Sequence, residues 1–127
     1  MEGNIKILVI DDEKIVRDIV RLWLGRVGFD VRVAENGRIG IEMQRADPAQ
    51  VVICDLIMPE QEGMETISQL RKEFPDTGVI AISGGGQIAP DAYLNVAGQL
   101  GAFKMFTKPL PMEKVVTAIN SWVEGDF

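Results

Sequence analysis

Three features of the sequence predict an α/β fold built on a parallel sheet. Short apolar runs alternate five times with segments whose apolar residues recur every three or four positions. Two of the runs, 51–54 and 79–82, are apolar throughout, as is typical of parallel strands covered on both faces. The hydrophobic share, 46% of 127 residues, is enough for one sizeable core. We therefore predict one doubly wound domain over residues 1–127, with right-handed crossovers and helices on both faces of the sheet.

The individual elements follow from their spacing. A strand over 5–10 precedes a helix over 13–27, which has a broad apolar face and Gly28 placed at its end. Alternation over 31–33 predicts a shorter, less buried strand, followed by a weaker helix over 37–46. The remaining elements are predicted as a strand at 51–54, a helix at 64–74, a strand at 79–82, a helix at 90–100, a strand at 103–107 and a helix at 115–123.

Charge and residue content exclude several functions. A net charge of −6 repels nucleic-acid backbones, so direct DNA or RNA binding is not expected. No apolar run approaches the length of a membrane span, and the N-terminus lacks a signal-peptide pattern, so we expect a cytoplasmic protein. The absence of histidine excludes histidine-based triads and histidine metal ligands. Cys54, the only cysteine, is expected to be a small buried hydrophobic residue.

Polar residues follow four of the five predicted strands. They are Asp11 and Asp12 after the first strand, Asp55 after the third, Ser83 after the fourth and Lys108 after the fifth; Gly84 follows Ser83, and Pro109 follows Lys108. Because open α/β sheets bind ligands outside the carboxyl ends of their strands, we expect these residues to meet. A lone Asp at such a place is often a helix N-cap, and for Asp12 taken alone the two interpretations are about equally favoured.

The chemistry of this set indicates phosphoryl transfer to Asp55. Converging carboxylates repel one another, and an oxygen-only ligand set suits Mg²⁺. Lys108 supplies a compact positive charge for a phosphoryl oxygen, Ser83 a hydroxyl donor, and the glycines from Gly84 onward a close backbone approach. A carboxylate nucleophile with these neighbours can stabilise the charge that develops as the phosphoryl group moves.

These residues, together with the segment 55–59 (Asp-Leu-Ile-Met-Pro) and Gly63, resemble the receiver domain of two-component response regulators along the whole chain. The resemblance implies a flavodoxin-like (βα)5 sandwich with a five-stranded parallel sheet of order 2-1-3-4-5. It also implies a phosphorelay in which Asp55 takes a phosphoryl group from a phosphohistidine on a sensor histidine kinase or a histidine phosphotransfer protein. The absence of histidine fits this role, because the donor histidine would belong to the partner.

The resemblance assigns roles residue by residue. The expected Mg²⁺ ligands are Asp11, Asp12, Asp55 and the backbone carbonyl of Ile57. Ser83, Gly84 and Lys108 would bind or respond to the phosphoryl group, and the Lys108–Pro109 bond is expected to be cis. The output would be a changed surface around strand five, meeting a downstream target protein, an output domain on a separate or longer chain, or a second copy in a homodimer. Such a switch promotes its own phosphorylation and dephosphorylation and is not a turnover enzyme.

One position departs from the common receiver pattern, and two others bear on the loss of phosphate. Receivers usually carry Tyr or Phe three residues before the strand-five lysine, where this chain has Met105. We expect the switch to act through Ser83 and the 84–90 loop, with Met105 following as a flexible side chain. Ile57 and Gly85 lie where receivers influence the approach of water to the phosphoryl group, and neither side chain can hydrogen-bond water. This predicts modest intrinsic dephosphorylation.

Two other functions remain open at this stage. One is a Mg²⁺-dependent phosphohydrolase with an aspartate nucleophile, although haloacid-dehalogenase-type phosphatases want a second Asp where this chain has Ile57. The other is a pseudo-receiver, a binding module that is never phosphorylated.

Overall fold

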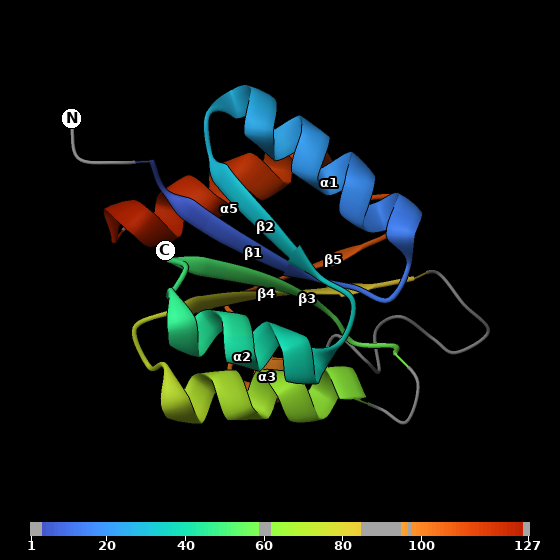
Figure 1. Cartoon of the computed structure of the whole chain (residues 1–127), viewed down its shortest axis with the longest axis vertical. Coiled ribbons are helices and arrows are strands. Elements are labelled where there is room, and N and C mark those ends of the chain that lie inside the picture. The colour runs from blue at the N-terminus through green and yellow to red at the C-terminus, as the bar shows by residue number, and fades with distance from the viewer. Residues whose placement is uncertain (1–3, 59–61, 85–94, 97, 126–127) are drawn as a thin grey trace.

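The protein is a parallel sheet with helices on both faces (Figure 1). The computed structural model describes residues 4–58, 62–84, 95, 96 and 98–125. Its five strands lie in the order β2-β1-β3-β4-β5, and every neighbouring pair is parallel. This confirms the order that the receiver resemblance implies. The strands are β1 (Lys6–Ile10), β2 (Asp30–Ala34), β3 (Val51–Asp55), β4 (Gly78–Ser83) and β5 (Lys104–Thr107).

The helices form two layers. In Figure 1, α1 and α5 cover one face of the sheet, and α2 and α3 cover the other. Their bounds are α1 (Lys14–Val27), α2 (Gly37–Ala46), α3 (Glu62–Glu73) and α5 (Met112–Glu124). In the region predicted as a helix over 90–100, residues 95, 96 and 98–100 are helical, and the rest of that prediction lies outside the described residues.

Each strand contributes alternate side chains to two separate cores. Leu8, Val52 and Cys54 face α2 and α3, whereas Val9 and Ile53 face α1 and α5. Both β3 and β4 are buried along their whole length, which explains why their sequences are apolar without alternation. The expectation that Cys54 is a buried apolar residue is confirmed. The edge strand β2 is only partly buried, also as predicted.

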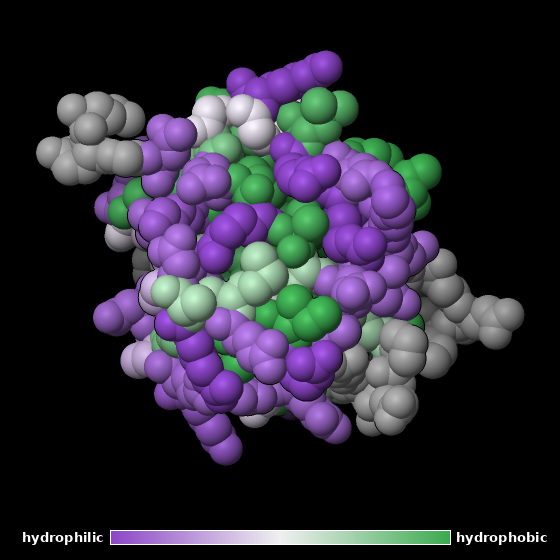
Figure 2. All heavy atoms as spheres, viewed as in Figure 1, coloured by the Kyte–Doolittle hydropathy of each residue, from purple (hydrophilic) through white to green (hydrophobic). Residues whose placement is uncertain are grey.

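Helix α1 buries less of its apolar face than its spacing predicts. Val20 and Leu24 are buried against the sheet, but Ile15, Ile19 and Leu22 are 67%, 51% and 57% exposed. Figure 2 shows hydrophobic surface, in green, at the upper right, where α1 lies in Figure 1. A helix lying on a sheet contacts it through one stripe, so apolar residues on its flank stay in solvent. The predicted end of α1 is confirmed, since Gly28 adopts the left-handed conformation there with φ 116°.

Candidate functional site

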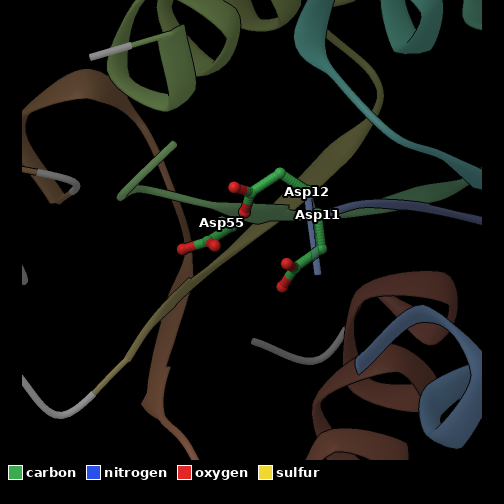
Figure 3. Close-up of side chains that lie close together, drawn as sticks. All are labelled: Asp11, Asp12 and Asp55. Carbon is green, nitrogen blue, oxygen red and sulfur yellow. The ribbon is translucent and has the colours of Figure 1, made fainter. Parts of the chain in front are cut away.

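The carboxyl edge of the sheet brings three aspartates together. Asp11 and Asp12 follow β1, and Asp55 is the last residue of β3 (Figure 3). One carboxylate oxygen from each lies within 4.8 Å of the others. Asp11 and Asp55 are buried, whereas Asp12 is exposed. The structure thus confirms that the three predicted acidic residues converge at one place.

Strand pairing explains this convergence. Ile10 is the register partner of Cys54, so the next residues along the two chains, Asp11 and Asp55, lie side by side. The Asp11 N–H donates to the carbonyl of Ala34 at 3.1 Å, which continues the β1–β2 ladder by one residue. The Asp11 side chain then accepts the N–H of Glu13 through Oδ1 at 2.8 Å, and the chain turns into α1.

The cap of α1 is not Asp12. Glu13 occupies the N-cap position without a side-chain cap hydrogen bond, and Asp11 supplies the carboxylate oxygen that accepts a backbone N–H at this turn. The interpretation of Asp12 as a helix cap is therefore wrong. Its exposed carboxylate remains available for a ligand at the site.

Lys108 is the counter-charge of the cluster. Its ammonium lies 2.9 Å from Asp11 Oδ2, 3.2 Å from Asp55 Oδ2 and 2.7 Å from Glu13 Oε1. The Lys108 N–H donates to the carbonyl of Ser83 at 2.8 Å, which positions the residue just beyond β5. The predicted cis bond between Lys108 and Pro109 is confirmed.

Burial disfavours the charged Lys108 ammonium, but close contacts with the carboxylates of Glu13 and Asp11 and the charge of Asp55 outweigh this effect and raise the pKa of Lys108 above its ordinary value. The contact from Glu13 was not anticipated from the sequence. The available signal was a third consecutive acidic residue after the first strand.

The surroundings of Asp55 disfavour its ionised form. Burial, followed by the charge of Asp11, raises the pKa of Asp55 to about 6. The N–H of Ile57, which donates to Asp55 Oδ1 at 3.0 Å, and the ammonium of Lys108 oppose this rise. The free protein therefore has a carboxyl group that gains stability whenever further positive charge reaches it.

The contact that the structure shows between Ile57 and Asp55 is made by the Ile57 backbone N–H. The role expected for its carbonyl as a metal ligand stays a prediction. The Ile57 side chain is 43% exposed. Its apolar surface therefore meets solvent two residues after the candidate acceptor.

The remaining predicted residues do not contact the aspartate cluster through their side chains in the free protein. Ser83 is buried, and its hydroxyl donates to the carbonyl of Gly84 at 3.2 Å, so it faces its own loop. A Cβ added to half-buried Gly84 would lie 4.0 Å from Lys108 Cδ. Met105 packs against the α2–α3 core and Phe106 against the α1–α5 core, so these two neighbours on β5 point to opposite faces of the sheet. Residues 85–90 lie outside the described part of the chain.

The donor set fits a hard divalent cation. Asp11 Oδ2 is buried and forms an ion pair with the Lys108 ammonium at 2.9 Å, but it accepts no well-aligned hydrogen bond from the described residues. Three carboxylates within ligand reach of one another, with oxygen donors only, are the ligand type preferred by Mg²⁺.

Comparison with known proteins agrees with this site. The family model described as the response regulator receiver domain matches residues 7–120. The transcriptional regulatory protein GlrR of Escherichia coli (strain K12) is 32% identical over 118 residues, which cover 93% of this chain and 26% of that protein. The response regulator protein PilR of Pseudomonas aeruginosa is 30% identical over 119 residues, covering 91% and 26%.

A solved structure gives the same result. The response regulator receiver domain protein from Clostridium thermocellum superposes with a TM-score of 0.84 at 30% identity, covering 94% of each chain. This chain spans about a quarter of the length of the relatives GlrR and PilR, and 49% of the response regulator MprA of Mycolicibacterium vanbaalenii. The family match extends from β1 into α5 and includes every residue of the acidic cluster, so the chain belongs to the response regulator receiver domains of two-component systems.

Proposed function

We propose that this receiver is a phosphoryl-accepting switch whose acceptor is Asp55. The observation that carries the proposal is the arrangement around this carboxylate, with the Asp11 and Asp12 oxygens within 4.8 Å and the Lys108 ammonium at 3.2 Å. Burial and a neighbouring anion make the free carboxylate unfavourable, so incoming positive charge stabilises the site. A phosphoryl group adds further negative charge, which the Lys108 ammonium and a bound cation would offset.

The proposed donor is a phosphohistidine on a sensor kinase or a phosphotransfer protein. An Asp55 carboxylate oxygen attacks phosphorus, the N–P bond breaks, and the histidine nitrogen leaves with the electron pair and takes a proton. The Lys108 ammonium stabilises the phosphoryl oxygens as this happens. The Ser83 hydroxyl, which bonds the Gly84 carbonyl in the free protein, turns to the phosphoryl group.

We propose that the site also holds Mg²⁺. The ligands would be Asp11, Asp12, Asp55 and the backbone carbonyl of Ile57. When bound, Mg²⁺ supplies positive charge that offsets the repulsion among the carboxylates and among the phosphoryl oxygens. The exposed Asp12 would be the ligand nearest to solvent.

The chain would act as a switch and not as a turnover enzyme. Ile57 stands two residues after the acceptor, where a second carboxyl group would serve a phosphohydrolase as general acid and base. The output would be a changed surface around β5, read by a target protein, by an output domain on a separate or longer chain, or by a second copy in a homodimer. The net charge of −6 argues against direct contact with nucleic acid.

We also propose a cytoplasmic location. A phosphohistidine donor is made from ATP, so its acceptor needs access to the compartment that contains ATP. Within the described part of the chain, no helix combines the length and the apolar character that crossing a bilayer requires.

Intact-mass measurement after incubation with Mg²⁺ and acetyl phosphate tests the proposed function. We expect addition of one phosphoryl group per chain, loss of that product in Asp55→Asn, and full retention in Asp76→Asn, an exposed acid in the turn between α3 and β4. Rapid turnover of unrelated phosphate esters would support a phosphohydrolase instead. No modification of a folded wild-type chain would support a pseudo-receiver.

A further inference from the structure

Glu13 makes the shortest of the contacts to Lys108, yet it lies outside the proposed set of Mg²⁺ ligands. Its Oε1 is 2.7 Å from the Lys108 ammonium. The Glu13 side chain is 55% exposed, whereas that of Lys108 is 13% exposed. Although Glu13 is the N-cap residue of α1, its side chain makes no cap hydrogen bond. This side chain therefore bridges the start of α1 to the end of β5, 95 residues away.

The other two partners of Lys108 are the carboxylates that a cation would use. Asp11 and Asp55 both contact the ammonium, and both belong to the proposed Mg²⁺ cluster. A divalent cation and an ammonium repel each other at this range, so Lys108 must loosen its contacts with both aspartates when the cation binds. Glu13 is the partner that the cation does not take.

We propose that Glu13 is a positioning residue that retains the Lys108 ammonium at the mouth of the site when a cation occupies the space between Asp11 and Asp55. This inference rests on the proposed cation site. It gives Lys108 a second defined position, from which the ammonium moves to a phosphoryl oxygen once Asp55 is modified. The contact also links α1 to the β5–α5 connection in the cation-loaded state.

The proposal predicts that Glu13 favours cation binding through Lys108. In the free protein, Lys108 keeps Asp11 and Asp55 as partners even without Glu13. In the cation-loaded protein, Asp11 and Asp55 bind the cation and are less available as partners of Lys108. Loss of Glu13 then leaves the Lys108 ammonium near the cation without a carboxylate of its own. Removing Glu13 is therefore more costly in the loaded state than in the free state, and the affinity for Mg²⁺ falls.

A titration with Mg²⁺ alone, followed by amide NMR shifts of the whole chain at fixed pH and ionic strength, measures this effect. The variants are Glu13→Gln and the charge-matched Glu35→Gln, each made with Lys108 and in a Lys108→Met background. Glu35 is exposed directly after β2, at the same edge of the sheet. Amide dispersion shows whether each variant is folded, and Lys108→Gln replaces Lys108→Met if the latter is not.

With Lys108 present, we expect Glu13→Gln to weaken Mg²⁺ binding by about fivefold, the size of one partly exposed ion pair. Glu35→Gln should weaken it by less than about a factor of 2, since only screened long-range charge is lost. In the Lys108→Met background, the effect of Glu13→Gln should fall to that of Glu35→Gln. Rescue of affinity by Glu13→Asp would be partial, because the shorter side chain reaches less far.

Two results would overturn the proposal while leaving the phosphoryl switch intact. One is an equal effect of Glu13→Gln and Glu35→Gln with Lys108 present. The other is an undiminished effect of Glu13→Gln without Lys108, which would make Glu13 a direct ligand or a simple source of charge. A wild-type protein that takes a phosphoryl group on Asp55 in either case separates these failures from failure of the proposed function. Absence of Mg²⁺ binding by the wild-type protein would contradict both the proposed cation site and the proposed role of Glu13.

Discussion

Gly63 lies directly against the main chain that carries Asp55. A Cβ at Gly63 would contact the carbonyl oxygen of Asp55 and would lie 2.7 Å from the carbonyl oxygen of Leu56. Real Cβ atoms essentially never come that close to backbone, which cannot move aside as a flexible side chain does. The absence of a side chain therefore lets the first turn of α3 press onto the β3 end and hold Asp55 in place.

Gly63→Ala should destabilise the protein by about 1–3 kcal/mol, because the added methyl group overpacks a backbone contact. It should also slow phosphorylation of Asp55 by acetyl phosphate. Urea unfolding and intact mass measure the two effects. The control is Gly25→Ala within α1, where a Cβ meets no atom within 4 Å and helix propensity predicts stabilisation of up to about 1 kcal/mol. Equal stability of Gly63→Ala and wild type would contradict the close contact.

Asp55 should make the protein less stable as the pH rises from about 4 to about 6. Its pKa is raised from 3.8 to about 6 in the folded protein, so the native state binds the proton more tightly than the unfolded chain does. Unfolding releases that proton within this window, and the free energy of unfolding falls as pH rises until the folded group has ionised. Asp55→Asn removes the charge and should be more stable than wild type at pH 8 by up to about 3 kcal/mol.

The measurement is urea unfolding of both proteins with EDTA from pH 4 to pH 8. Acids with lowered pKa, such as Glu73 beside Arg45, weaken the protein at the low end, but they are common to both proteins and cancel in the difference. A difference that stays constant across the range would show that Asp55 titrates as an ordinary exposed acid.

Mg²⁺ should stabilise the wild-type protein at pH 8. A ligand that binds only the native state at about ten times its Kd adds about 1.4 kcal/mol to the free energy of unfolding. Asp12→Asn should lose most of this gain, since it removes the exposed carboxylate of the cluster, whereas Asp76→Asn should keep it. Thermal unfolding with and without Mg²⁺ gives the comparison. The same increase in Asp12→Asn as in wild type would exclude Asp12 from the cation site.

Gln44 stabilises the segments that lead into β3 and β4, at the end of the sheet opposite the aspartate cluster. Its side chain is fully buried, accepts the Ala49 N–H at 2.9 Å, and donates to the Ala49 carbonyl at 3.0 Å and the Thr77 hydroxyl at 3.1 Å. Gln44→Leu leaves these groups buried without this partner and should cost about 2–4 kcal/mol in urea unfolding. The exposed Gln69→Leu on α3 is the control and should change stability by less than about 0.5 kcal/mol. A neutral Gln44→Leu would mean that water or Thr77 replaces the lost bonds.

The parts of the site that could be predicted from sequence are those set by backbone topology. Once 51–54 is a central parallel strand, Asp55 must leave the sheet where Asp11 does, because both follow paired strands. The orientation of a side chain beyond that point depends on local contacts. The Ser83 hydroxyl faces Gly84, and Glu13 reaches across to Lys108, and neither follows from strand order.

The burial of side chains on α1 also could not be predicted in full from the sequence. Periodicity marked one broad apolar face, but only Val20 and Leu24 reach full burial, and Ile15 stays mostly in solvent. How far a helix rolls on a sheet depends on the volume of side chains from both layers, and the spacing of apolar residues carries no information on that. The assignment of the helix end at Gly28 was accurate because a left-handed residue at that point is a local property.

Ile57 should slow the loss of phosphate from Asp55. Its N–H bonds Asp55 Oδ1, while its side chain, 43% exposed, presents only carbon to the solvent beside the acceptor. An attacking water there finds no side-chain hydrogen-bond partner at this position, so orientation of the nucleophile contributes little. Ile57→Asn offers a carbonyl and an amide at the same place and keeps the backbone N–H that bonds Asp55.

We therefore expect Ile57→Asn to lose phosphate several-fold faster than wild type. This gain is smaller than the roughly 10²-fold that a well-positioned general acid or base contributes at least. The assay follows intact mass after removal of acetyl phosphate at constant Mg²⁺. Ile57→Leu controls for altered packing and should lose phosphate at the wild-type rate, because it keeps an apolar side chain of equal size at this position. Faster loss from wild type than from Ile57→Asn would mean that the apolar side chain does not limit water, and that hydrolysis is controlled instead by Lys108 and the cation ligands on the other side of Asp55.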